Sequence, residues 1–322
     1  MIRRLTTVLA AMAAVLALAA PAGADPAGPT DFQNEILRVE PMPDGVQFSI
    51  VGGDAFLRAE VEPGVELTVM GYFGEPYLRV LADGTVEENA LSPSVVLNED
   101  RYGTSVDFDR EDALLPPEWR VVGSEGSWTW HDHRIHWMAE SPPPGRSPGD
   151  LVFGEVTVPV VVDGTATTLY VSLEWLERPF PLAAVAGLAL GLGAAWLLRH
   201  RVDVVLAVVA LLALTIGLRQ WLFLPSETEP SFLQWAVPVI AGTFVVLGMR
   251  RPLIANIAHL VAAAELTAWG VWRWENMIRA VLPTAQPWAF DRLVTALALS
   301  VGATAVAVLV TDRLRPAPTA AD

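Results

Sequence analysis

The sequence predicts two regions in one chain: an all-β outer domain of immunoglobulin-like β-sandwich type, followed by an all-α transmembrane bundle of five helices. Apolar residues alternate with polar ones over much of 45–178, which is typical of half-buried strands. The dipeptide Asp163-Gly164 favours a tight hairpin turn within that range, because both residues tolerate positive φ. Apolar segments of membrane-spanning length then occupy 179–312.

The first 24 residues have the pattern of a secretory signal peptide. Two arginines precede an apolar run from 5 to 20, and the small residues at 22–24 fit an A-x-A cleavage site. We therefore expect the mature chain to begin near Asp25. Residues 25–44 are rich in Pro, Gly and Asp and are expected to form a flexible leader.

About seven to nine short strands are expected in the extracytoplasmic domain, which favours a sandwich over a helical domain. The clearest hairpin has apolar residues at every second position on both sides of its turn: Val156, Val158, Val160 and Val162, then Leu169, Val171, Leu173 and Trp175. No helix is expected in this domain. The chain contains no cysteine, so the domain must be stabilised by a hydrophobic core without disulfides.

The net charge of −15 excludes some classes of partner. Acidic residues are concentrated in the outer domain, which disfavours nucleic acid and is compatible with cations. The sequence also has no cysteine nucleophile, no G-x-S-x-G elbow and no phosphate-binding glycine loop, so no catalysis is expected.

Five apolar segments are expected to be helices, because backbone groups must pair internally in a bilayer. They cover 182–198, 202–218, 233–249, 253–272 and 293–311. Basic pairs lie at ends that would all face the cytoplasm: Arg199 and Arg201, Arg250 and Arg251, Arg313 and Arg315. The positive-inside rule then predicts a multi-pass plasma-membrane protein in the lipid bilayer, with an extracytoplasmic N-terminal domain and a cytoplasmic tail over 313–322.

A histidine-rich stretch, SWTWHDHRIHWM, occupies 127–138 between two proline-rich loops. If 127–133 is a strand, His131 and His133 point to the same face and can share one copper or zinc ion. His136 has the wrong parity, so it joins them only if the chain turns at Arg134-Ile135. Met138 would offer a soft ligand to copper. The alternative interpretation is a structural network of Trp, His, Arg and Asp side chains, in which Asp132 orients its neighbours.

The fourth apolar segment contains the polar residues Asn256, His259 and Glu265. Ionisable side chains inside a membrane are costly and are functional candidates. They are interpreted either as a proton or cation relay or as interhelical hydrogen bonds that hold the bundle together. Glu265 lies about 120° around the helix from His259 and further still from Asn256, so the three do not form one stripe.

A longer series of motifs resembles a group of uncharacterised exported membrane proteins of actinobacteria. The motifs are Gly71-Tyr72, Glu75 to Arg79, Asp83-Gly84, Ser92-Pro93, Leu97-Asn98, Arg101-Tyr102, Pro116-Pro117-x-Trp119 and the run from Trp130 to Met138. This resemblance covers most of the outer domain and implies the architecture without an activity. H-x-H-x-x-H is also faintly similar to the H-x-H-x-D-H run of metallo-hydrolases, but Ile135 stands where that family has aspartate.

Two functions from different classes follow from these observations. The first is a binding or scaffold domain that contacts other exported or membrane proteins. The second is binding and handling of copper or zinc at the cell surface through His131, His133 and His136.

Overall fold

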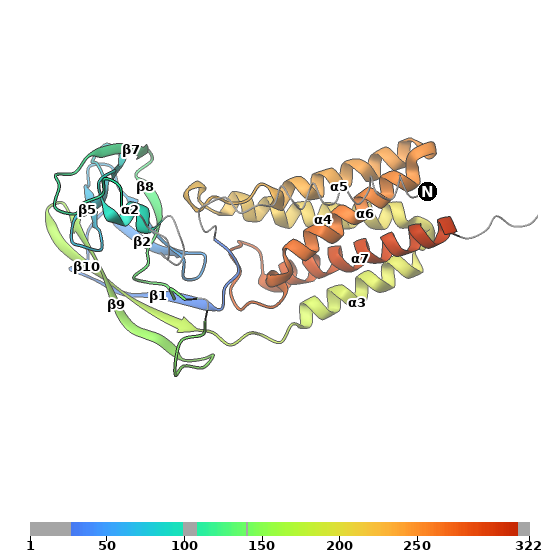
Figure 1. Cartoon of the computed structure of the whole chain (residues 1–322), viewed down its shortest axis with the longest axis horizontal. Helices are drawn as coiled ribbons and strands as arrows, with labels where there is room; N and C mark the ends of the chain where they lie inside the picture. Colours follow the sequence, from blue (N-terminus) through green and yellow to red (C-terminus); the bar gives the residue numbers. More distant parts are fainter. Residues whose placement is uncertain (1–26, 99–107, 140, 315–322) are drawn as a thin grey trace, which may run out of the picture.

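The computed structural model describes residues 27–98, 108–139 and 141–314, with side chains as far as residue 311. The predicted signal peptide and most of the predicted cytoplasmic tail lie outside these residues. The described chain has a mostly antiparallel β-sheet region followed by a helical region, and the β region lies at one end of the helices (Figure 1).

Two antiparallel sheets make up the β region. The larger has the order β1-β10-β9-β4-β5-β6-β7 and the smaller β2-β3-β8. Side chains from both sheets, such as Leu57 and Val160, form one buried core. The immunoglobulin-like assignment stays a prediction. The strands are β1 Phe32–Glu40, β2 Val46–Val51, β3 Phe56–Val61, β4 Leu67–Met70, β5 Pro76–Val80, β6 Val86–Asn89, β7 Trp119–Gly123, β8 Ser127–His131, β9 Leu151–Val162 and β10 Thr165–Trp175.

The predicted hairpin is confirmed. β9 and β10 pair in antiparallel register around Asp163 and Gly164, whose φ angles are 47° and 76°. Positive φ at both positions is what a type I′ turn requires.

The expectation of a flexible leader over 25–44 is wrong for β1. This strand pairs with β10 from Phe32 to Glu40, and its Ile36 and Val39 pack against the core of the β region. Pairing satisfies the backbone groups that a flexible leader would leave to water. The Pro, Gly and Asp residues on either side of this strand concealed its alternation.

A short helix, α2 (Pro93–Leu97), corrects the expectation of an all-β outer domain. Ser92 caps it by accepting a hydrogen bond from the Ser94 backbone N–H at 3.2 Å, and Pro93 occupies its first position. Serine as N-cap followed by proline is a recognised start signal for a helix.

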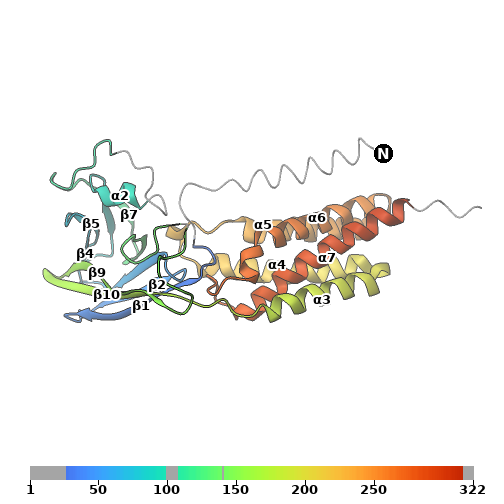
Figure 2. The same ribbon diagram turned by 60° about the horizontal axis from the view of Figure 1, so that its bottom comes forward.

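Four helices in the described part of the chain are long and apolar enough to cross a membrane: Arg199–Phe223, Leu233–Arg250, Pro252–Trp272 and Trp288–Thr311. They run side by side with a shorter apolar helix (Figure 2). The α-helices are α3 Leu182–Leu197, α4 Val202–Phe223, α5 Leu233–Arg250, α6 Ala255–Trp272 and α7 Trp288–Leu314; the 3-10 helices are η1 Arg199–Arg201, η2 Ser226–Thr228, η3 Pro252–Ile254 and η4 Trp274–Met277. These spans are compatible with a protein in a lipid bilayer.

The two regions are joined by buried contacts near Asp31. Thr30 forms an isolated bridge with Val281, which lies between α6 and α7. The Asp31 carboxylate accepts hydrogen bonds from Arg178 at 2.8 Å, Arg279 at 2.7 Å and the Ala280 N–H at 3.0 Å. Burial alone would raise the pKa of Asp31, but these donors hold it below its usual range. The carboxylate is therefore ionised and fixes the β region against the bundle.

Glycine allows α3 and α7 to pack closely. A Cβ atom on Gly187 would lie 2.3 Å from the Leu293 backbone oxygen, whereas a Cβ on Gly193 would meet nothing within 4 Å. We expect Gly187→Ala to destabilise the helical region by about 1–3 kcal/mol, because backbone must move to admit the methyl group. Gly193→Ala is the matched control and should be neutral or stabilising by up to about 1 kcal/mol through helix propensity. Thermal unfolding followed by helical circular dichroism in detergent measures both; equal effects would contradict this packing.

Candidate metal site

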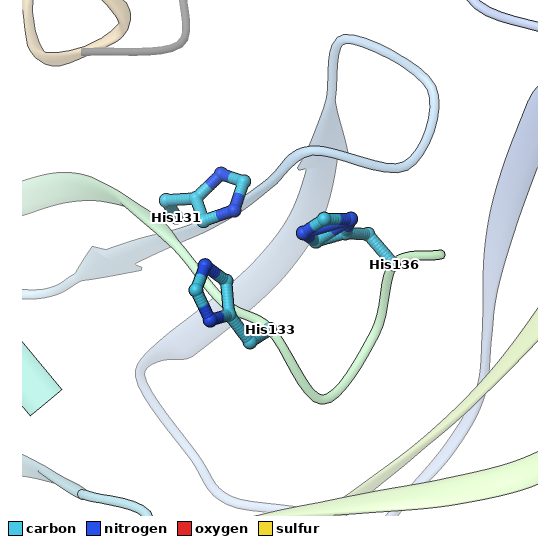
Figure 3. A group of neighbouring side chains, drawn as sticks. All are labelled: His131, His133 and His136. Atoms are coloured by element: carbon cyan, nitrogen blue, oxygen red, sulfur yellow. The ribbon is translucent and has the colours of Figure 1, made fainter. Parts of the chain in front are cut away.

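The histidine stretch forms the end of an edge strand and the turn that follows it. β8 ends at His131, which pairs with Phe56 at the start of β3. The chain then turns, with the Ile135 N–H donating to the Asp132 carbonyl at 3.2 Å. This turn brings His133 and His136 back toward His131 (Figure 3). The turn needed to include His136 is therefore present.

Asp132 and Arg134 stabilise the turn. Arg134 donates from Nε to Asp132 Oδ1 at 2.8 Å and from a terminal nitrogen to Oδ2 at 2.6 Å. Oδ2 also accepts from the Trp130 indole at 3.1 Å. Burial would raise the pKa of Asp132, but the charge and hydrogen bonds of Arg134 lower it overall. Both oxygens are engaged within the turn, so the prediction of a structural role for Asp132 is confirmed.

Ile135 anchors the turn from the core side. Its side chain is 0% exposed, and its carbonyl accepts a 2.6 Å hydrogen bond from the Asn34 side chain on β1. The same Asn34 nitrogen donates to the Ser172 carbonyl on β10 at 3.1 Å. The need for an apolar anchor explains why position 135 carries isoleucine. The donor to its carbonyl, Asn34, lies on β1, which was expected to belong to the flexible leader and not to the domain.

Three imidazole rings meet at this turn. One ring nitrogen from each of His131, His133 and His136 can be chosen so that all three lie within 4.8 Å of one another. Three points at that spacing lie within about 2.8 Å of a common centre, and bonds from histidine to zinc are about 2.0–2.1 Å. Small changes of side-chain torsion would therefore bring all three nitrogens into bonding distance of one ion.

The surroundings of the rings orient them. His136 Nδ1 lies 3.0 Å from the Trp137 carbonyl oxygen. When Nδ1 carries the proton it donates to that oxygen, and Nε2 is then the nitrogen that would ligate an ion, the arrangement common among metal-ligating histidines. Phe56 packs edge-on against the His131 ring at 5.4 Å between centroids, and Tyr72 stacks on His133 at 6.0 Å.

Tyr72 is a neighbour of the site that the sequence marked only as part of the Gly71-Tyr72 motif, without a role beside the histidines. Its hydroxyl accepts a hydrogen bond from the backbone N–H of His133 at 2.8 Å and donates one to the side-chain oxygen of Asn98. Burial raises the pKa of Tyr72 well above its ordinary value. The phenol therefore stays protonated and acts as a support for His133. Local sequence did not indicate that Tyr72 contacts His133 or that Asn34 contacts Ile135, because each contact joins residues far apart in the sequence. The role of Met138 as a copper ligand stays a prediction.

The polar residues of the fourth apolar segment do not form one site. Asn256 lies in the first turn of α6, so it is inside the helix as predicted, and its side chain is exposed. His259 and Glu265 are buried. The His259 ring lies against Gly248 of α5, in space that a side chain at position 248 would occupy. Among the described residues, His259 Nε2 and Glu265 Oε2 have no hydrogen-bond partner. Interhelical hydrogen bonds are thus not found for these two atoms.

A buried polar network lies at the end of the bundle nearest the β region. Arg273 forms a bidentate ion pair with Asp291 at 2.8 and 2.9 Å and donates to Gln220 at 2.7 Å. Asn276 and Gln286 each donate to Asp291 at 2.9 Å. Gln220 lies in α4, Asp291 lies in α7, and the other three residues lie in the connection that follows α6, so the network ties this connection to two helices.

Comparison of the chain with protein-family models, curated proteins and solved structures finds no match.

Proposed function

We propose that this chain is a multi-pass membrane protein whose extracytoplasmic domain binds a copper or zinc ion through His131, His133 and His136. The observation that carries the proposal is the convergence of three imidazole nitrogens at one point. Neutral imidazole is a good ligand for both metals.

The number of ligands indicates how the ion is held. Structural zinc sites normally have four protein ligands, whereas three leave a coordination position open. An open position allows the ion to be loaded and released by ligand exchange. We therefore propose reversible binding and handling of the ion; the expectation of no catalysis comes from the sequence motifs and not from the number of ligands.

The membrane placement is part of the same proposal. α3 would be a fifth span; its 16 residues extend about 24 Å, somewhat short of the hydrocarbon core of about 30 Å, a mismatch that local thinning of the bilayer accommodates. Its outward side chains are apolar, for example Leu188, Leu190 and Leu192. The C-terminal ends of α3 and α5 lie at the end of the bundle away from the β region (Figure 1). Arg199 follows α3 and Arg250 ends α5, which supports an outer β domain under the positive-inside rule.

Metal titration of the purified full-length protein in detergent tests the proposal. We expect Cu²⁺ or Zn²⁺ to bind with a Kd well below millimolar, and the His131→Ala/His133→Ala/His136→Ala variant to bind at least about 100-fold more weakly, since all protein ligands are lost. His200→Ala removes an exposed histidine far from the site and should leave the affinity unchanged. Affinity should fall as pH is lowered, because protons compete for imidazole.

Two results would contradict metal binding. One is a wild-type Kd in the millimolar range or weaker for both ions. The other is the same affinity in the wild type and the triple variant. Either result would leave the outer domain as a binding or scaffold module for other exported or membrane proteins.

A further inference from the structure

A groove of about 350 Å³ lies between the β region and the bundle, and His131 forms part of its wall. The opposite side is formed by the connection between α4 and α5, with Ser226, Glu227 and Glu229. β8 lies directly against η2 in this connection. The membrane region therefore contributes residues to the approach to the histidine site.

Apolar side chains hold the connection between α4 and α5 against the β region beside the groove. Leu224, at the end of α4, shares a buried apolar cluster with Phe56. Phe56 in turn contacts the His131 ring. The acidic connection is thus held in place beside the site by apolar packing.

The groove carries a net negative charge. Glu88 is neutralised by Arg120, with Nε to Oε1 at 2.9 Å. Glu227 and Glu229 have no arginine within ion-pair distance among the residues that the structure describes. Two uncompensated carboxylates in a groove concentrate cations there.

A buried hydroxyl in the groove wall is a second, independent sign of a polar ligand. Thr129 is 2% exposed, and its Oγ1 has no hydrogen-bond partner among the described residues. It lines the same groove as His131 and lies two residues before it on β8, on the same face of the strand. Buried hydroxyl groups normally have a partner, which water or a hydrated ion in the groove would supply.

Two of the three histidines are buried and the third is partly exposed. His131, in the groove wall, is 7% exposed, His136 is 1% exposed, and His133 is intermediate. We propose that the groove is the port by which a hydrated divalent cation reaches the histidine site, and that Glu227 and Glu229 steer the cation into it. This inference rests on the proposed metal binding and assigns to the membrane region a role in loading the outer domain.

The test is the rate of Cu²⁺ association with the full-length protein in detergent, followed by quenching of tryptophan fluorescence in a stopped-flow instrument. Cu²⁺ is chosen because imidazole sites bind it more tightly than Zn²⁺. The Glu227→Gln/Glu229→Gln variant should associate about 3- to 10-fold more slowly at low ionic strength, because two attractive charges are lost. At about 0.5 M salt the difference should shrink to less than about twofold, and the dissociation rate should be unchanged.

The control removes the same charge elsewhere. Glu62 and Glu66 are exposed and lie beyond the end of β3 that is remote from Phe56. The Glu62→Gln/Glu66→Gln variant should associate within about twofold of the wild type at low salt, since these charges are more distant from the groove.

Each outcome is decisive. Equal association rates in wild type and the Glu227→Gln/Glu229→Gln variant would overturn the port while leaving metal binding intact. An unchanged association rate with faster dissociation would also overturn steering, because the carboxylates would then be ligands. Wild-type protein that fails to bind Cu²⁺ would overturn both proposals.

Discussion

Replacing Arg273 by methionine is expected to destabilise the helical region by about 3–5 kcal/mol, the cost typical of breaking a buried ion pair. Arg273 and Asp291 have side chains 3% and 0% exposed. Without the guanidinium, the Asp291 carboxyl group is left buried without its counter-charge and without two of its hydrogen bonds. Thermal unfolding followed by helical circular dichroism in detergent measures the loss.

A double-mutant cycle separates the charge pair from its surroundings. Asp291→Asn alone should also cost about 3 kcal/mol or more, because it leaves Arg273 as the uncompensated charge. The Arg273→Met/Asp291→Asn variant should be destabilised by less than the sum of the single changes, since neither charge then remains. Additive effects would show that the two side chains contribute independently.

Asp132→Asn is expected to destabilise the β region by about 3 kcal/mol, because Arg134 would remain half buried without its counter-charge. The same change should weaken metal binding on the order of tenfold or more, as is typical when residues that position metal ligands are altered. Calorimetric unfolding of the full-length protein gives the first effect, and Cu²⁺ titration gives the second.

An exposed pair provides the control for Asp132. Arg38 and Glu155 form a bidentate ion pair with exposed side chains. Glu155→Gln removes the same charge from an arginine pair, yet solvent screens it, so the unfolding temperature should be nearly unchanged. If Asp132→Asn is equally harmless in stability and in metal affinity, the ion pair does not hold the turn.

In the helical region, the positions of the helices could be predicted from the sequence, but the contacts between them could not. The helices lie close to the expected segments because a long apolar run carries its own signal, whatever its neighbours. The pairing of Arg273 with Asp291 was not predicted, because it depends on which faces of α6 and α7 meet. Between α6 and α7 the chain forms η4, and beyond it Val281 pairs with Thr30, a residue far away in the sequence.

In the histidine site, the residue types by themselves determined which side chains were candidates. Strand alternation was the reason to expect His131 and His133 on one face, but β8 ends at His131, so it is the turn that brings His133 beside His131. Only the tertiary structure decided that His136 joins them. The turn depends on the Asn34 contact with the Ile135 carbonyl, which joins residues 101 apart in sequence, and the groove depends on the bundle lying against β8. Local patterns contain no information about such contacts, because their energies exist only once distant segments have come together.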